Sequence, residues 1–278
     1  MPRPAVIVVT SHVARGGVGG RASVFTLERM GFPVWSLPTV TLSWHPGHGA
    51  PARLAADPQG FTAIANGLGG SRFLPEVGGV LSGYFDSVEQ IEATAALVFA
   101  MKKANPRAIF LCDPVIGDSG GLFRAEGIAA AIRDRLLPLA DIATPNRHEL
   151  AWLADAQPLG TATLVSAARR LGPKEVVVTS AFAPKGEIGT LLVAPNDVHL
   201  ATHAELPNAP NGTGDVLAAR YLGRRLDGLP PAAALERAVA AVFRLVKLAA
   251  ESGANELPLA SGQDALRAEP SGVVMTKL

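Results

Sequence analysis

The chain has 278 residues with a formal net charge of +1, and 48% of its residues are hydrophobic against 18% charged. The balanced charge gives no general basis for binding nucleic acid or an anionic membrane surface, and the high hydrophobic fraction excludes a disordered chain. No apolar run approaches the roughly 18 residues that span a bilayer, the N-terminus has no long apolar signal core, and a single cysteine excludes an internal disulfide. We therefore expect a soluble, cytoplasmic globular protein.

Short apolar runs alternate along the chain with longer segments of helical periodicity. Continuous runs rich in β-branched residues, such as AVIVVT at 5–10, are typical of strands buried on both faces of a sheet. The predicted strands cover residues 5–10, 34–37, 80–82, 109–113, 142–144, 175–180 and 188–193. The predicted helices cover residues 22–30, 87–103, 126–137, 147–154, 161–171, 215–226 and 231–251. This alternation predicts one three-layer α/β domain over residues 1–278, with a mostly parallel central sheet and helices on both faces.

Two predicted helices carry end signals. Ser87, followed three residues later by Gln90, is the pattern of a capping box at the start of the second helix. Gly31 stands directly after the first helix, where glycine often ends a helix in a left-handed conformation.

Polar residues follow the predicted strands. Ligands of open parallel sheets bind outside the carboxyl ends of the strands, so these residues are candidates for a site. They are Ser11, His12, 82–84, Asp113, 144–146, Thr179 and Ser180. Small polar residues also occur wherever strands turn, so specific motifs have to identify the site.

Two glycine-rich motifs fit known patterns without the context that those patterns need. Residues 17–22 (GVGGRA) fit the dinucleotide pattern G-x-G-x-x-A, yet no Asp or Glu lies between Glu28 and Asp57 to hold a ribose. Residues 117–121 (GDSGG) fit G-x-S-x-G, but residues 114–117 separate the serine from its strand, whereas a hydrolase needs it on the turn directly after a strand. We interpret both as flexible glycine loops, the first one near a small ligand.

The motif Gly212-Thr213-Gly214-Asp215 opens a predicted helix. Its successive N–H groups can converge on an anion at the positive end of the helix dipole. A carboxylate there would repel a phosphate, unless it accepts the proton of a nucleophile that attacks the phosphate. Asp is also a common helix cap, and the motif alone does not decide between these two roles. A P-loop is excluded, because the chain has no Gly-Lys dipeptide.

Taken together, the motifs resemble the ribokinase-like superfamily and, within it, the pyridoxal kinases. The matching segments occur in the order of that family from about residue 5 to about residue 250. They are 11–13 with Gly16 and Gly19, Val34-Trp35, Thr39-Val40 and His45, 81–84, 113–118 (DPVIGD), 144–150 (TPNRHEL), Thr179-Ser180, and 212–215 (GTGD). The resemblance implies ATP-dependent phosphorylation of the 5′-hydroxymethyl group of pyridoxal, and of pyridoxine or pyridoxamine, in vitamin B6 salvage. A hydroxymethylpyrimidine kinase of the same superfamily and a catalytically silent binder of pyridoxal or its phosphate are the alternatives.

The resemblance also assigns the catalytic and nucleotide-binding residues. It implies that Asp215 deprotonates the hydroxymethyl group, and that Gly212, Thr213 and Gly214 form an anion hole for the transferred phosphoryl group. The residues that it places around the co-substrate ATP are Asp113, Asp118, Thr144, Glu149, Thr179, Ser180, Gly212 and Gly214. The residues that it places near Mg²⁺, partly through water, and near a monovalent cation (K⁺ or Na⁺) are Asn146, Glu149, Asp113 and Thr144.

On the vitamin side, the resemblance implies that Ser11 hydrogen-bonds the pyridine ring system and that Tyr84 stacks on it. The other pocket residues that it implies are Val18, Val40 and His45. The chain departs from the family at Pro46, where many pyridoxal kinases carry a threonine, and at Phe123, where relatives can have a tyrosine. These differences concern ring selectivity and the lid. The resemblance further implies a homodimer.

Overall fold

The computed structural model describes residues 3–278. The α-helices are α1 (Gly20–Arg29), α2 (Pro58–Gly69), α3 (Val88–Ala104), α4 (Glu126–Ala131), α5 (Arg147–Leu153), α6 (Thr161–Arg170), α7 (Thr213–Leu226) and α8 (Pro231–Ser252). The strands are β1 (Ala5–Val13), β2 (Val34–Leu42), β3 (Arg53–Ala55), β4 (Val77–Ser82), β5 (Ile109–Cys112), β6 (Gly117–Asp118), β7 (Gly121–Leu122), β8 (Ile142–Ala143), β9 (Glu175–Ala181), β10 (Glu187–Val193), β11 (Val198–Ala204) and β12 (Val274–Lys277).

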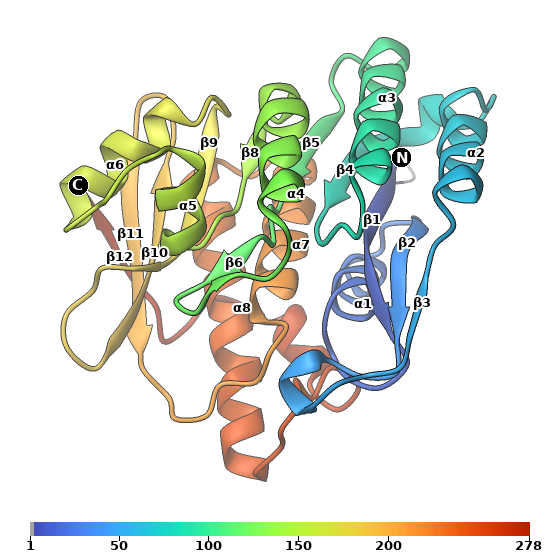
Figure 1. The fold of residues 1–278 in the computed structure, drawn as a ribbon. Coiled ribbons are helices and arrows are strands. Elements are labelled where there is room, and N and C mark those ends of the chain that lie inside the picture. The colour runs from blue at the N-terminus through green and yellow to red at the C-terminus, as the bar shows by residue number, and fades with distance from the viewer. Residues whose placement is uncertain (1–2) are drawn as a thin grey trace.

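One ten-stranded sheet runs through the molecule in the order β12-β11-β10-β9-β8-β5-β4-β1-β2-β3, and β6 pairs with β7 as a separate hairpin (Figure 1). The strands from β9 to β2 in this order are parallel to their neighbours, whereas β10, β11 and β12 at one edge and β3 at the other are antiparallel. The α/β class and the mostly parallel centre are confirmed. The antiparallel edges were not predicted.

Both faces of the sheet are covered, as the continuous apolar run of β1 predicts. Val6 and Val8 pack with residues of α1, α7 and α8, whereas Ile7 and Val9 pack with residues of α2, α3 and α4 on the opposite face. Helices α5 and α6 extend that second layer over β9 and β10. Because successive side chains of a strand point to opposite faces, an apolar residue is needed at every position of β1.

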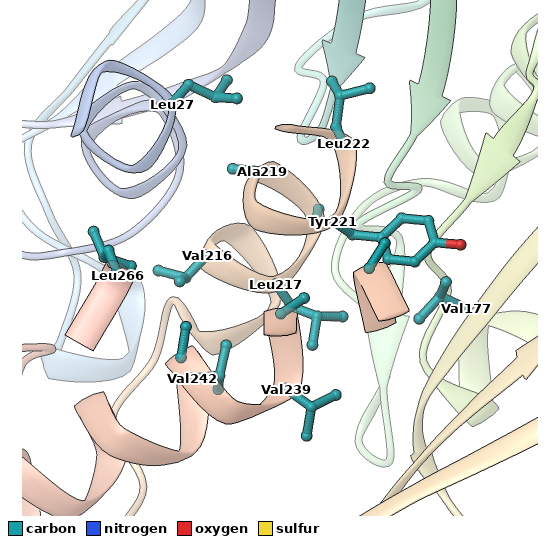
Figure 2. Packing of buried hydrophobic residues seen from close by; sticks show 14 of the residues in the cluster. Leu27, Val177, Val216, Leu217, Ala219, Tyr221, Leu222, Val239, Val242 and Leu266 are labelled. Atoms are coloured by element: carbon teal, nitrogen blue, oxygen red, sulfur yellow. The ribbon is translucent and has the colours of Figure 1, made fainter. Parts of the chain in front are cut away.

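Helix α7 lies in the middle of its layer. Figure 2 shows its buried side chains between Leu27 of α1, Val242 of α8 and Val177 of β9. Near its C-terminal end, the Tyr221 hydroxyl donates to the carboxylate of Glu175 at 2.7 Å, and Arg225 pairs with the same carboxylate. These contacts hold the helix on the start of β9.

The ends of several elements differ from the predictions. Strand β1 continues to Val13 with a register shift between Thr10 and His12, so the strand ends three residues later than predicted. The predicted helix 126–137 is α4 followed by a π-helical turn (Ile132–Leu136) and a 3₁₀ turn (Leu137–Leu139). Pro138 accounts for this break, because its ring has no N–H and clashes with the carbonyl four residues earlier.

The capping box at α3 is only half formed. The Ser87 hydroxyl accepts from the Gln90 N–H at 3.3 Å, but the Gln90 amide does not return to the Ser87 backbone. It accepts from the Asp86 N–H and donates to the Thr39 carbonyl at 2.8 Å instead. Gln90 therefore joins α3 to the end of β2. Gly31 has a φ of 88° directly after α1, as predicted.

None of the described helices is long and apolar enough to cross a bilayer.

Candidate active site

The first turn of α7 lies directly against the glycine loop that follows β1. Gly212 precedes the helix with a φ of 94°, a left-handed conformation that favours glycine. A Cβ at this position would also collide with the carbonyl oxygen of Gly17. The two glycine motifs, far apart in the sequence, therefore form one site.

Asp215 connects these two motifs through a hydrogen bond. Its Oδ2 accepts from the Gly19 N–H at 2.9 Å. Gly19 in turn packs so closely on Ser11 that a Cβ would lie 2.6 Å from the Ser11 carbonyl and hydroxyl oxygens. Gly212 occupies the cap position of α7, and no side chain caps the helix, so the interpretation of Asp215 as a helix cap is wrong.

Three carboxyl groups have raised pKa values: those of the buried Asp113 and Glu149 and that of the half-buried Asp215. Burial raises the pKa of Asp215 to about 6, although the Gly19 N–H acts in the opposite direction. Burial raises the pKa of Glu149 to about 7 against the effect of the N–H groups that it accepts. The pKa of Asp113 lies well above its ordinary value because the group is buried beside the charges of Glu149 and Asp215. Within residues 3–278, no salt bridge balances these carboxylates.

This unbalanced charge predicts that Asp113→Asn stabilises the free protein above neutral pH. A carboxyl group whose pKa is raised by folding favours the folded state at low pH, and this contribution is lost as pH rises through the raised pKa. We expect the variant to melt about 2–4 °C higher than the wild type at pH 8, the shift for ~1 kcal/mol, with the difference shrinking toward pH 4. Thermal melts across this pH range measure it, and a variant that melts no higher at pH 8 would contradict the prediction.

The cluster of Asp113, Glu149 and Asp215 also fits a cation, although protein side chains alone would not complete its coordination shell. Among the described residues, no group of three or more His, Cys, Asp or Glu side chains is arranged to hold a metal ion. The side chains of Thr144 and Asp113 are buried beside each other and supply two hard oxygen donors. Mg²⁺ prefers such donors and keeps several waters, so water and phosphate oxygens would complete its shell.

Asn146 and Glu149, predicted as metal residues, form a capping box at the start of α5. The Asn146 Oδ1 accepts from the His148 and Glu149 N–H groups, and Glu149 Oε2 accepts from the Asn146 N–H at 2.8 Å. Glu149 Oε1 accepts from the N–H groups of Ile116 and Gly117. The Asn146 Nδ2 donates to the Gly117 carbonyl at 2.8 Å. Both side chains thereby hold the 114–118 loop against α5, so any contact with a metal is in addition to this role.

The structure brings some of the predicted nucleotide residues together. Asn146, beyond the end of β8, bridges to Thr179 in the last part of β9, and the Thr179 N–H donates to the Pro145 carbonyl at 3.0 Å. Thr144 therefore lies in the same row of strand ends. Ser180 is exposed and has a φ of 51°. Asp118 is exposed on the β6–β7 hairpin, near enough to Glu149 to raise its pKa.

The predicted vitamin-side aromatic, Tyr84, is half-buried beyond the end of β4. Its backbone is held on both sides: the N–H donates to Thr10 Oγ1 at 3.0 Å, and the carbonyl accepts from Thr39 Oγ1 at 2.7 Å. Burial raises the pKa of its hydroxyl. Val40, which follows Thr39, is fully buried. The backbone hydrogen bonds fix this segment, so the ring can be removed without releasing the main chain.

Asp86 is a residue of this region that the sequence analysis missed. Its carboxylate pairs with Arg53 of the edge strand β3 at 2.5 Å and with Arg124 of the segment after the β6–β7 hairpin at 2.9 Å. It thus joins its own loop beside Tyr84 to strand β3 and to the segment after the β6–β7 hairpin. No sequence signal marks it, because the partners lie 33 and 38 residues away.

Of the remaining predicted pocket residues, Val18 lies in the glycine loop itself and His45 precedes a turn near it. Val18 contacts Gly212 closely enough that a Cβ on the glycine would lie 3.1 Å from a Val18 methyl group. The turn after His45 approaches the same region, since a Cβ on Gly47 would lie 3.1 Å from the Asn211 amide nitrogen. Glu256, a second residue that the sequence analysis missed, contacts both segments.

Comparison with known proteins places the chain among small-molecule kinases. The family model described as phosphomethylpyrimidine kinase matches residues 77–260. A pyridoxal kinase of Rubrobacter xylanophilus is 36% identical over 276 residues, covering 95% of this chain and 94% of the relative. Another, from Granulibacter bethesdensis, is 36% identical over 264 residues, covering 91% of this chain and 92% of the relative. The solved structure of Leishmania donovani pyridoxal kinase in complex with ADP and pyridoxamine superposes with a TM-score of 0.93 at 30% identity and covers 99% of each chain.

Proposed function

The chain belongs to the pyridoxal kinase family, and on this premise we propose that it transfers the γ-phosphoryl group of ATP to the 5′-hydroxymethyl group of pyridoxal. The observation that carries the proposal is the half-buried Asp215 carboxylate in the first turn of α7, held by the Gly19 N–H of the vitamin-side loop. A silent binder would have no use for a carboxylate at this place. The similarity to pyridoxal kinases supports pyridoxal, and not hydroxymethylpyrimidine, as the acceptor.

In the proposed reaction, Asp215 takes the proton of the hydroxymethyl group as the oxygen attacks the γ-phosphorus. The new O–P bond forms while the bond from the γ-phosphorus to the bridging oxygen breaks, and ADP leaves. A pKa of about 6 leaves the carboxylate ionised at neutral pH and still basic enough to accept the proton. The N–H groups of 212–214 stabilise the charge on the transferred group, helped by the dipole of α7.

We assign the nucleotide side to the row of strand ends and to the 114–118 loop. Asp113 and Thr144 would hold Mg²⁺, with Asn146 and Glu149 acting through water, and the ion would neutralise phosphate charge. The raised pKa values of Asp113 and Glu149 support a cation here. The other residues proposed to contact ATP are Asp118, Thr179, Ser180, Gly212 and Gly214.

On the vitamin side, we propose that Ser11 hydrogen-bonds the pyridine ring and that Tyr84 stacks on it, with Val18, Val40 and His45 around them. Pro46 has no side-chain donor, so the turn that carries it offers the ring substituents fewer polar contacts than a threonine would. A monovalent cation near the phosphates, a homodimer and a cytoplasmic location complete the proposal.

A kinetic panel tests this function. ATP consumption is measured with Mg²⁺ and each of pyridoxal, pyridoxine, pyridoxamine and hydroxymethylpyrimidine as acceptor. We expect the highest kcat/KM with one of the three vitamers. A clear preference for hydroxymethylpyrimidine, or tight pyridoxal binding without turnover, would contradict the proposal and identify the alternative.

Removing the proposed stacking ring gives a second test. Tyr84→Ala is expected to weaken pyridoxal binding by about 0.5–1.5 kcal/mol of aromatic pairing, in addition to any lost burial. The KM for ATP should not change, because the backbone of this segment is held by Thr10 and Thr39. Steady-state kinetics of this variant beside Phe73→Ala, which removes an exposed aromatic elsewhere, measure the effect. An unaltered KM for pyridoxal would assign Tyr84 to packing alone.

A further inference from the structure

The carboxylate of Glu256, in the segment after α8, is within hydrogen-bond distance of three donors from two loops that are far apart in the sequence. Its Oε1 lies 3.1 Å from Arg15 Nη1 and 3.0 Å from His48 Nε2, and its Oε2 accepts from the Gly17 N–H at 3.2 Å. The side chain is only 16% exposed. Arg15 and Gly17 belong to the glycine loop after β1, and His48 belongs to the turn after β2. The two loops follow the paired strands β1 and β2, and Arg15 also donates to the Asn255 side chain at 3.3 Å.

The first arm of this contact leads to the proposed catalytic base. Gly17 donates its N–H to Glu256 and presents its carbonyl to Gly212, at the start of α7. Two residues later, the Gly19 N–H donates to Asp215. The hydrogen bond to Glu256 therefore orients the peptide group of Gly17, two residues before the Gly19 N–H that donates to Asp215.

The second arm leads to the rim of the vitamin pocket. His48 ends the turn Pro46–His48, and the Gly47 N–H is held by the ring of His45 at 3.0 Å. On its other side, this turn lies against Asn211, the residue before Gly212. The contact between Glu256 and His48 thus holds the turn that bears His45 and Pro46 close to α7.

We propose that Glu256 is a positioning residue for the phosphoryl transfer: its carboxylate holds the glycine loop so that the Gly19 N–H stays on Asp215, and it holds the 46–48 turn at the pocket. The assignment of a reaction to this residue rests on the proposed kinase function. Glu256 belongs to neither large apolar cluster, so its role lies in the loops and not in the core. A carboxylate suits this position because hydrogen bonds to charged groups are stronger than neutral ones.

Four variants separate the two arms. Glu256→Ala removes the contacts with both loops, and Glu256→Gln keeps one acceptor oxygen for the Gly17 N–H. His48→Ala removes only the contact between Glu256 and the 46–48 turn. Glu251→Ala, an exposed glutamate of α8, is the matched control. We expect Glu256→Ala to lower kcat about 10–100-fold, as small misplacements of catalytic groups do, and to raise the KM for pyridoxal but not for ATP. Glu256→Gln should recover part of kcat, and His48→Ala should change only the KM for pyridoxal.

Amide hydrogen exchange of the substrate-free protein gives a readout that does not depend on the reaction. Glu256→Ala should speed exchange in 14–19 and 46–49 and leave the strands unchanged, at an unaltered melting temperature. Unchanged exchange in both loops, or kinetics equal to those of the control, would overturn the proposal. A loss of activity that only follows a loss of folded protein would overturn it as well. If the wild type and Glu251→Ala fail to phosphorylate any vitamer, the proposed function fails, and the exchange data still decide whether Glu256 holds the loops.

Discussion

Asp215→Asn is expected to lower kcat at least about a hundredfold in a protein that still folds and binds both substrates, since general-base assistance contributes roughly 10²–10⁴-fold. The amide oxygen of asparagine can still accept from the Gly19 N–H, so the geometry of the loop survives. It cannot take up the proton of the hydroxymethyl group. Burial raises the pKa of this carboxyl, so replacing it by a neutral group removes the free-energy cost of ionising it inside the protein. The melting temperature at neutral pH should therefore stay equal or rise.

The measurement combines kcat, ATP affinity and the melting temperature of the same preparation. Asp264→Asn changes an exposed aspartate far along the chain and should behave as the wild type. ATP affinity of Asp215→Asn should stay the same or increase, because a negative charge beside the proposed phosphate site is gone. A kcat close to that of the wild type would exclude Asp215 as the base, and a collapse in stability would assign it a structural role.

The layers of the fold could be predicted because strands buried on both faces appear in the sequence as continuous apolar runs. Every residue from Ala5 to Val9 is apolar, and the structure packs these residues alternately on the two helical layers. The edge strands carry no comparable signal. All three residues of β3 are exposed, and β12 is largely exposed, so neither shows the apolar run that marks a central strand.

The motifs of the site could be predicted from the sequence, but the contacts between residues of different motifs and loops could not. The segment GVGGRA fits a dinucleotide pattern, yet its glycines serve close packing: Gly19 against Ser11, and Gly17 against Gly212. Glu256 and Asp86 were missed because each binds side chains or backbone groups of loops that only the folded chain brings near. Gln90 shows the same limit, since its predicted partner at Ser87 competes with a carbonyl of β2 that is 51 residues away.

Glu149→Gln tests whether Glu149 acts by holding the 114–118 loop or by holding the metal ion. The wild-type carboxylate accepts from Ile116 and Gly117 through one oxygen and from Asn146 through the other. An amide presents a donor on one side, so at least one of these N–H groups loses its acceptor. The loop also contains Val115 with a φ of 43°, a conformation that β-branched residues rarely adopt and that neighbouring contacts must hold in place.

We therefore expect Glu149→Gln to lower kcat about a hundredfold, with a loss that saturating Mg²⁺ does not recover, because Asp113 and Asp118 flank the loop that is released. The Mg²⁺ requirement should also rise, since a negative charge near the proposed ion is gone, while pyridoxal binding should change little.

The stability of the Glu149→Gln variant should change little at pH 7. An unsatisfied buried N–H costs about 1–3 kcal/mol, and removing a buried carboxyl with a pKa of about 7 offsets this loss. Mg²⁺ titrations of kcat beside Glu126→Gln, an exposed glutamate of α4, decide between the two roles. Full recovery of kcat at high Mg²⁺ would show that Glu149 acts on the metal and that its hold on the loop is dispensable for catalysis.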